Sequence, residues 1–121
     1  MKHSPEFMKM VNEAKSRVKE CDVDDINNRL GNGEALNLID CREESEWSDG
    51  HIAKAQYIGK GVVERDIENL YPDKNTELIF YCGGGFRSVL VCDSLLKMGY
   101  SNVVSMDGGW RSWKDKGFST E

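Results

Sequence analysis

Apolar residues near the start of the chain recur at the spacing of one helix face. The steps between them are four, three and four, with lysine and glutamate on the other faces, and the residues are Phe7, Val11, Ala14 and Val18. Ser4, Pro5 and Glu6 supply a hydroxyl cap, a proline in the first turn and a carboxylate near the positive end of the helix dipole. The pattern predicts an amphipathic helix from Ser4 to about Glu20 whose apolar stripe packs on the main body.

Downstream, strand-like apolar runs alternate with helical patterns. The run 77–81 is almost continuously apolar, as in a central parallel strand that is covered on both faces. Further strands are predicted at 35–40, 56–58 and 102–106, helices at 22 to 31 or 33, 62–70 and 87–98, and a polar loop at 41–50. Because strands and helices alternate, we expect an α/β fold with a mostly parallel sheet and helices on both of its faces.

Composition and charge narrow the classes of function. The 121 residues are 39% hydrophobic and 31% charged, which is typical of one globular domain. Sixteen basic and twenty-one acidic residues give a net charge of −5, which argues against binding nucleic acid or an anionic membrane through overall charge. No apolar stretch approaches the roughly 20 residues of a membrane helix, and no apolar signal-peptide core is present, so we expect a cytoplasmic protein.

The cysteines and histidines do not form a metal-binding pattern. The four cysteines are widely spaced without a C-x-x-C pair, and they are Cys21, Cys41, Cys82 and Cys92. The two histidines, His3 and His51, add little to a zinc site, and we expect no metal, no organic cofactor and no disulfide framework.

The loop that follows the predicted strand 77–81 carries the candidate chemistry. Cys82 lies between the end of a buried strand and the start of a helix, where open α/β sheets bind ligands. Three glycines at 83–85 allow successive N–H groups to turn toward the sulfur, and the helix dipole and Arg87 add positive potential. These features favour a reactive thiolate. The alternative is a small buried cysteine in a tight turn, but such a turn needs neither three glycines nor the arginine.

Several motifs occur in a recognisable order. The loop C-G-G-G-F-R-S at 82–88 is preceded by D-C-R at 40–42, an acidic and aromatic segment at 43–47 and G-H-I-A-K-A at 50–55, and it is followed by D-G-G-W at 107–110 and Trp113. In this order the motifs resemble those of the rhodanese-like sulfurtransferases. The resemblance spans about residues 22–118 and leaves the first helix as an extension.

The resemblance implies a fold, a boundary and a reaction. The fold is a three-layer arrangement around a five-stranded, mostly parallel sheet, with a helical extension at 1–21 packed on a domain at 22–121. Cys82 is implied as the catalytic residue that takes a sulfane sulfur from an anionic donor such as thiosulfate, or from a persulfide-donor protein, and passes it to a thiol or cyanide. The implied binding residues for donor and persulfide are Gly83, Gly84, Gly85, Phe86, Arg87 and Ser88. Their N–H groups would stabilise the persulfide, and Arg87 would attract the donor.

Residues outside the loop have less direct expected roles. By resemblance, Asp40 and Arg42 form a charged pair in the scaffold near the site. Phe86 is expected at the pocket rim, whereas Trp110 is expected to be a core aromatic and His51 a structural residue. Cys92 lies on an apolar stretch and is expected to be buried, while Cys41 at the mouth of the sheet remains open as a resolving thiol. Gly83 and Gly84 replace charged residues that many relatives carry, which leaves donor preference open.

Three other functions share parts of this pattern. Phosphatases and arsenate reductases of similar fold also use a cysteine and an arginine around an anion, but with five intervening residues instead of the four between Cys82 and Arg87. Some rhodanese-like domains have lost the cysteine and only bind partners, and Cys82 argues against that function here. A sulfur carrier that accepts persulfide from another protein uses the same Cys82 chemistry and stays open beside the thiosulfate enzyme.

Overall fold

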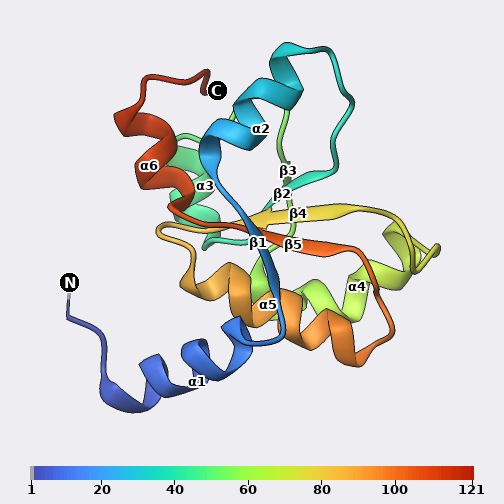
Figure 1. Ribbon diagram of the computed structural model, residues 1–121. Helices are drawn as coiled ribbons and strands as arrows, with labels where there is room; N and C mark the ends of the chain where they lie inside the picture. Colours follow the sequence, from blue (N-terminus) through green and yellow to red (C-terminus); the bar gives the residue numbers. More distant parts are fainter. Residues whose placement is uncertain (1) are drawn as a thin grey trace.

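A parallel sheet forms the centre of the computed structural model, which describes residues 2–121 (Figure 1). Its strand order is β1-β5-β4-β2-β3, and every neighbouring pair is parallel. The strands are β1 (Lys19–Cys21), β2 (Leu38–Asp40), β3 (Gln56–Tyr57), β4 (Leu78–Tyr81) and β5 (Val103–Met106). The helices are α1 (Pro5–Lys15), α2 (Val23–Gly31), α3 (Glu44–Asp49), the 3-10 turn η1 (Lys60–Val62), α4 (Val63–Leu70), α5 (Phe86–Lys97) and α6 (Gly109–Asp115). The predicted five-stranded α/β fold is confirmed.

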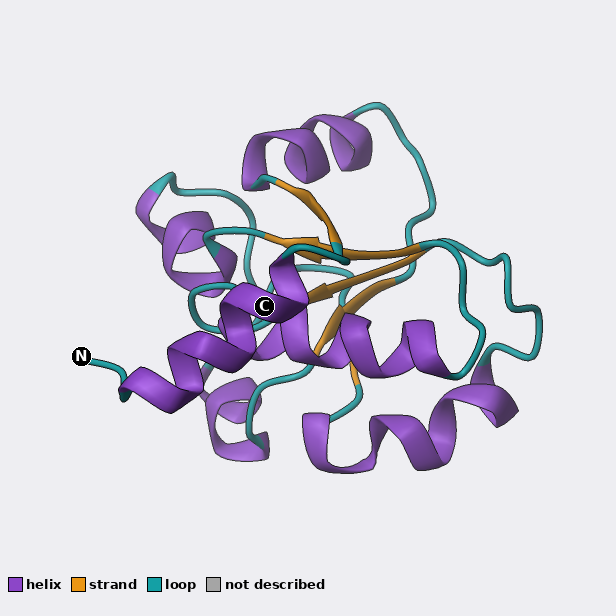
Figure 2. Ribbon diagram, turned by 60° about the horizontal axis from the view of Figure 1, so that its bottom comes forward, coloured by secondary structure: helices purple, strands orange, loops and turns teal. Residues whose placement is uncertain are grey.

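Helices cover both faces of the sheet, which gives three layers (Figures 1 and 2). One hydrophobic cluster joins α1, α4 and α5 to the sheet, and the other joins α2 and α6 to its opposite face. The central strand β4 contributes to both, since Leu78 and Phe80 pack in the first cluster and Ile79 and Tyr81 in the second. All four side chains are buried, as the continuous apolar run predicts for a doubly covered strand.

The N-terminal helix is shorter than predicted. It ends at Lys15 and not at Glu20. At this end, the Ser16 hydroxyl donates a hydrogen bond to the carbonyl of Glu13. Three residues later the chain enters the edge strand β1, which pairs with β5 and begins before the predicted boundary at residue 22. The strand consists of lysine, glutamate and cysteine and is mostly exposed. It therefore lacks the alternation of apolar and polar residues from which a strand can be predicted.

Two further short helices differ from the prediction. The expected polar loop at 41–50 contains α3, which begins with a capping box between Glu43 and Glu46. The glycine motif near the end leads into α6, whose first residue Gly109 and preceding Gly108 both have positive φ. Glutamate is a weak N-cap signal, and paired glycines usually indicate turns. The local sequence therefore does not predict α3 or α6. Within residues 2–121, every helix is too short or too polar to span a membrane.

Candidate active site

Cys82 lies immediately after β4, at the edge of the sheet where the parallel strands end (Figure 1). The loop at 83–85 carries the chain directly into α5, and Gly85 takes a left-handed conformation with φ of +110°. A side chain at that position would be strained and would also crowd Asp107, so the turn requires glycine. The cysteine is almost completely buried, with 1% of its surface exposed, and it contributes to the lining of an open pocket.

The sulfur of Cys82 accepts hydrogen bonds from the start of α5. The N–H groups of Gly85 and Ser88 lie 3.1 and 3.4 Å from Sγ. The Ser88 hydroxyl lies 3.5 Å from the same sulfur and shares a 2.8 Å hydrogen bond with the hydroxyl of Ser105. N–H donors and the positive end of a helix stabilise an anionic sulfur more than a neutral thiol.

Other N–H groups of the loop have no acceptor among the hydrogen bonds of residues 2–121. They belong to Gly83, Gly84, Phe86 and Arg87. The first N–H groups of a helix lack intrahelical partners and are suited to binding an anion. The loop can therefore offer donors to a second atom bound next to Sγ as well as to Sγ itself.

The start of α6 holds the cysteine loop in place through backbone hydrogen bonds. The N–H of Trp110 donates to the carbonyl of Cys82 at 2.8 Å, and the N–H of Arg111 donates to that of Gly83 at 3.1 Å. A Cβ on Gly109 would collide with the carbonyl oxygen of Cys82, so the two backbones approach this closely only because residue 109 is glycine. The D-G-G-W motif thus helps to set the position of the candidate nucleophile.

Arg87 is engaged in an ion pair that the sequence did not predict. Its guanidinium donates to both carboxylate oxygens of Glu46 in α3, at 2.7 and 3.1 Å. These hydrogen bonds lower the pKa of Glu46 below its ordinary value. A side chain on Gly83 would come within 3.0 Å of the Arg87 guanidinium, which places this cation over the loop. No spacing rule links Glu46 to Arg87, because they are distant in sequence and meet only through the fold.

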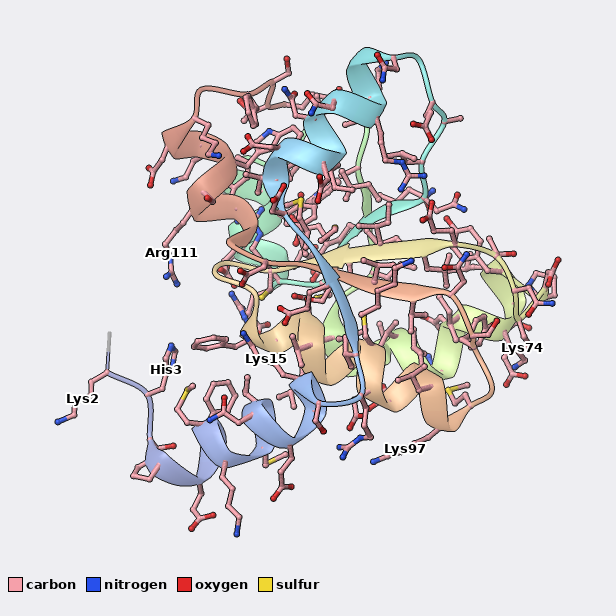
Figure 3. The ribbon with its side chains drawn as sticks, in the orientation of Figure 1. Lys2, His3, Lys15, Lys74, Lys97 and Arg111 are labelled. Atoms are coloured by element: carbon pink, nitrogen blue, oxygen red, sulfur yellow. The ribbon has the colours of Figure 1, made fainter. Side chains whose placement is uncertain are left out.

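Arg111 is a second cation at the site and was also missed from the sequence. Its guanidinium lies next to Gly84, where an added Cβ would be 3.2 Å from Nη1. Arg111 is exposed, and the hydrogen bonds and ion pairs found within residues 2–121 include none from its guanidinium. Figure 3 shows its side chain extending away from α6 toward the side of the molecule where His3 lies. Within residues 2–121 it therefore adds a positive charge that is not held in a direct ion pair.

An open pocket of about 440 Å³ joins these groups. Its lining combines the sulfur, the two cations, a carboxylate and three aromatic rings, contributed by His3, Phe7, Glu46, Cys82, Gly84, Phe86, Arg87 and Arg111. Phe86, which was expected at the rim, contacts the rings of His3 and Phe7 from the N-terminal segment. Pockets of this size hold small organic molecules.

Asp40 and Arg42 form a buried ion pair beside the pocket. Arg42 Nη2 lies 2.7 Å from Asp40 Oδ2 and also donates to the carbonyl of Gly50 at 2.7 Å. Its guanidinium lies 4.7 Å from the ring of Trp110, so the pair connects the end of β2 to α6. Trp110, which was expected in the core, is half-buried and packs against the hydrophobic cluster between the sheet, α2 and α6, and its backbone N–H contacts the cysteine loop.

The remaining candidates lie outside the pocket lining. His51 stacks on Trp47 with ring centroids 3.5 Å apart, and its Nδ1 lies 3.1 Å from the Trp47 carbonyl. Cys41 is buried, and its thiol donates to the carbonyl of Tyr81 at 3.3 Å. Burial raises the pKa of both Cys41 and Cys92, so these thiols stay protonated at neutral pH. The part of the chain that the structure describes has no cluster of three or more potential metal ligands.

Comparisons with known proteins agree with this geometry. Residues 22–116 match the family model of the rhodanese-like domain. The Bacillus subtilis protein named "Putative sulfurtransferase YtwF" is 34% identical over 97 residues, covering 80% of this chain and 91% of that protein. The rhodanese-like domain of an Anabaena protein has a similar structure, with a TM-score of 0.75, 27% identity, and coverage of 84% of this chain and 77% of that one.

A further structural neighbour also covers the N-terminal helix. It is a protein of unknown function from Rhodopseudomonas palustris, described as a "possible tyrosine phosphatase", with a TM-score of 0.87 and 25% identity. The match covers 100% of this chain and 98% of that one. The fold, the cysteine loop, the family model and the sulfurtransferase relative agree, and the chain belongs to the rhodanese-like domain family of sulfur-transferring proteins.

Proposed function

We propose that the protein is a sulfurtransferase that carries a sulfane sulfur as a persulfide on Cys82. One observation carries the proposal: Cys82 lines a pocket, and its Sγ accepts hydrogen bonds from the N–H groups of Gly85 and Ser88. Such donors can stabilise negative charge on the sulfur, and the anionic form of cysteine is its nucleophilic form. The donor is thiosulfate or another sulfane-sulfur compound, and the acceptor is cyanide or a thiol.

The proposed reaction has two balanced half-reactions. The Cys82 thiolate attacks the sulfane sulfur of thiosulfate, the sulfur–sulfur bond of the donor breaks, and sulfite leaves with the electron pair. Cyanide or a thiolate then attacks the outer sulfur of the Cys82 persulfide, giving thiocyanate or a new persulfide and restoring the thiolate. Neither half-reaction consumes an external oxidant or reductant, and neither uses a metal or organic cofactor.

The loop and the cations have separate proposed roles. The unpaired N–H groups at the start of α5 stabilise the negative charge on the outer persulfide sulfur. Arg111 attracts the anionic donor and offsets the charge that develops on the leaving sulfite. Arg87, for which the sequence predicts this role, is already paired with Glu46 and so contributes less net charge. Asp40 and Arg42 act by fixing the surrounding loops.

Two alternatives share the same residues. A sulfur carrier would load Cys82 from the persulfide of a partner protein and not from thiosulfate. A phosphatase, as in the description of the Rhodopseudomonas neighbour, would need room for a tetrahedral phosphate inside the loop. The six-residue loop from Cys82 to Arg87 is one residue shorter than the phosphatase pattern, which favours a single sulfur atom. The cytoplasmic location expected from the sequence stays a prediction.

Intact mass spectrometry tests the first half-reaction. After incubation of the reduced protein with thiosulfate, we expect a gain of one sulfur, about 32 Da, at Cys82, and its loss as thiocyanate on adding cyanide. The Cys82→Ser variant should gain nothing, whereas the control Cys21→Ser, which removes a thiol outside the pocket, should behave like the wild type. A persulfide on Cys82→Ser would contradict the mechanism. Loading only by a persulfide donor would identify a carrier, and hydrolysis of an aryl phosphate would identify a phosphatase.

A further inference from the structure

Two serine hydroxyls form a buried chain that ends at the sulfur of Cys82. Ser88 lies in the first turn of α5 and Ser105 lies in β5, and both side chains are completely buried. Ser88 Oγ lies 3.5 Å from Cys82 Sγ and 2.8 Å from Ser105 Oγ. Neither serine lines the pocket, so this chain reaches the sulfur from the interior of the protein.

The direction of hydrogen bonding along the chain follows from its protons. Each hydroxyl has one proton to donate, and within residues 2–121 the hydrogen-bond partners of the two hydroxyls are each other and the sulfur. If Ser88 donated to Ser105, the buried Ser105 proton would have no acceptor, which costs free energy. When Ser105 donates to Ser88, the Ser88 proton is available to Sγ and both protons are used. The chain therefore donates toward the sulfur.

The Ser88 hydroxyl is then a third donor to Sγ, beside the N–H groups of Gly85 and Ser88. Hydrogen bonds in a chain polarise one another, so a hydroxyl that accepts a hydrogen bond is a stronger donor. A serine hydroxyl in a helix can also turn toward a backbone carbonyl of the preceding turn. The bond from Ser105 opposes that rotation and keeps the Ser88 hydroxyl next to the sulfur.

We propose that Ser105 is a positioning residue, which holds the Ser88 hydroxyl as a hydrogen-bond donor to Cys82 Sγ. The inference rests on the proposed sulfur transfer for its effect on the reaction. When an acceptor attacks the outer sulfur of the persulfide, the sulfur–sulfur bond breaks and its electron pair stays on Sγ. The donors at Sγ stabilise this charge, and no proton moves along the chain. Ser105 thus acts on the sulfur that stays with the protein.

Alkylation of Cys82 by iodoacetamide tests this role without sulfur transfer, because the thiolate is the reacting form. The reaction is followed by mass spectrometry on the peptide that contains Cys82. In Ser105→Ala, the pH at which the alkylation rate is half-maximal should rise by about half a pH unit, somewhat less than the effect of one direct hydrogen bond. Ser105→Thr keeps the hydroxyl and should keep the wild-type midpoint, whereas Ser105→Val, of the same shape, should show the rise.

Two further variants separate positioning from packing. Val103 is buried in β5 two residues before Ser105, so its side chain lies on the same face of the strand. Val103→Ala should lower the urea midpoint and leave the alkylation midpoint unchanged. Ser88→Ala should raise the alkylation midpoint, and adding Ser105→Ala to it should bring no further rise, because Ser105 acts through Ser88.

The outcomes also distinguish this role from the proposed function. A wild-type alkylation midpoint in both Ser105→Ala and Ser105→Val would overturn the proposal, as would an equal rise in Val103→Ala or an additive rise in the double variant. If the wild type transfers no sulfur, the proposed function fails, and the alkylation profiles still decide the role of Ser105. If it does transfer sulfur, kcat/KM for cyanide should fall about twofold in Ser105→Ala, because a less stabilised thiolate leaves more slowly.

Discussion

At the scale of single residues, Glu46 opposes the binding of an anion in the candidate site. Its carboxylate lines the pocket and pairs with Arg87, so it offsets one of the two positive charges that an entering dianion would meet near the sulfur. Arg87 lowers the pKa of Glu46, and the carboxylate therefore stays charged through the neutral range and becomes protonated only when the pH falls below the ordinary range of a glutamate. The charge of this carboxylate is thus constant across the neutral pH range.

Replacing Glu46 with glutamine should improve the use of an anionic donor. Glu46→Gln keeps the shape but removes the charge, and we expect KM for thiosulfate to fall about three- to fivefold, the effect of a partly exposed charge. Steady-state kinetics at pH 7 and pH 8 should give the same gain, because Glu46 is ionised at both. Glu64→Gln, on the exposed side of α4, removes the same charge elsewhere and should leave KM unchanged. Equal effects of the two variants would indicate a net-charge effect.

The sequence identifies residues whose role follows from their own segment. The cysteine, the glycines and the following helix are contiguous, so local chemistry suffices to single out Cys82 and its N–H donors. Glu46 and Arg111 reach the site from α3 and α6, and only the packing of those helices brings them there. For Arg87, the sequence predicts a position in the site but not the ion pair with Glu46, which also depends on helix packing.

At the scale of elements, the approach of α6 to the cysteine loop depends on Gly109. Gly109→Ala adds a methyl group that collides with the Cys82 carbonyl at a residue with φ of +53°. We expect a loss of roughly 1–3 kcal/mol in unfolding free energy from backbone strain, and a lower kcat because the carbonyl and its sulfur must shift. Urea unfolding and donor kinetics on the same variant measure the two effects.

Gly117 provides the matched control for this substitution. It has φ of +73° but nothing within 4 Å of an added Cβ. Gly117→Ala should therefore cost about 1–2 kcal/mol of left-handed strain with unchanged kcat. The same loss of activity in both variants would show that backbone strain, and not the contact with Cys82, is responsible.

Elements with a strong local pattern were predictable and those without one were not. The buried strand β4 and the helix α5 stand out because continuous and periodic apolar residues leave few alternatives. The edge strand β1 is polar and is ordered by pairing with β5, so its formation depends on a strand more than eighty residues later. The short helices α3 and α6 are similarly held by tertiary contacts and not by propensity.

At the scale of the whole molecule, the N-terminal segment packs on α5 and also contributes residues to the pocket. Val11 and Ala14 are buried, and beyond the helix Arg17 donates two hydrogen bonds to Asp93 of α5, at 2.8 and 2.9 Å. At the other end of the segment, His3 and Phe7 line the pocket. The position of these two rings therefore depends on the packing and the ion pair that hold α1 on α5.

The Arg17–Asp93 pair gives this attachment a pH dependence. Its hydrogen bonds lower the pKa of Asp93 in the folded state, so the stabilisation is present above the ordinary aspartate value of 3.8 and is lost as the pH falls through the lowered folded value. At pH 7, Asp93→Asn should lower the urea midpoint by roughly half a molar. The difference from the wild type should narrow as the pH falls from about 5 toward 3.

The matched control for that experiment is Asp66→Asn. Asp66 pairs with Arg65, its neighbour in sequence, on the exposed surface of α4, and such pairs contribute little to stability. Its midpoint should equal that of the wild type at every pH. If the loss in Asp93→Asn stays constant down to pH 3, the cause is lost packing of the buried carboxylate and not its charge. The attachment of α1 would then rest on apolar packing, to which Val11 and Ala14 contribute.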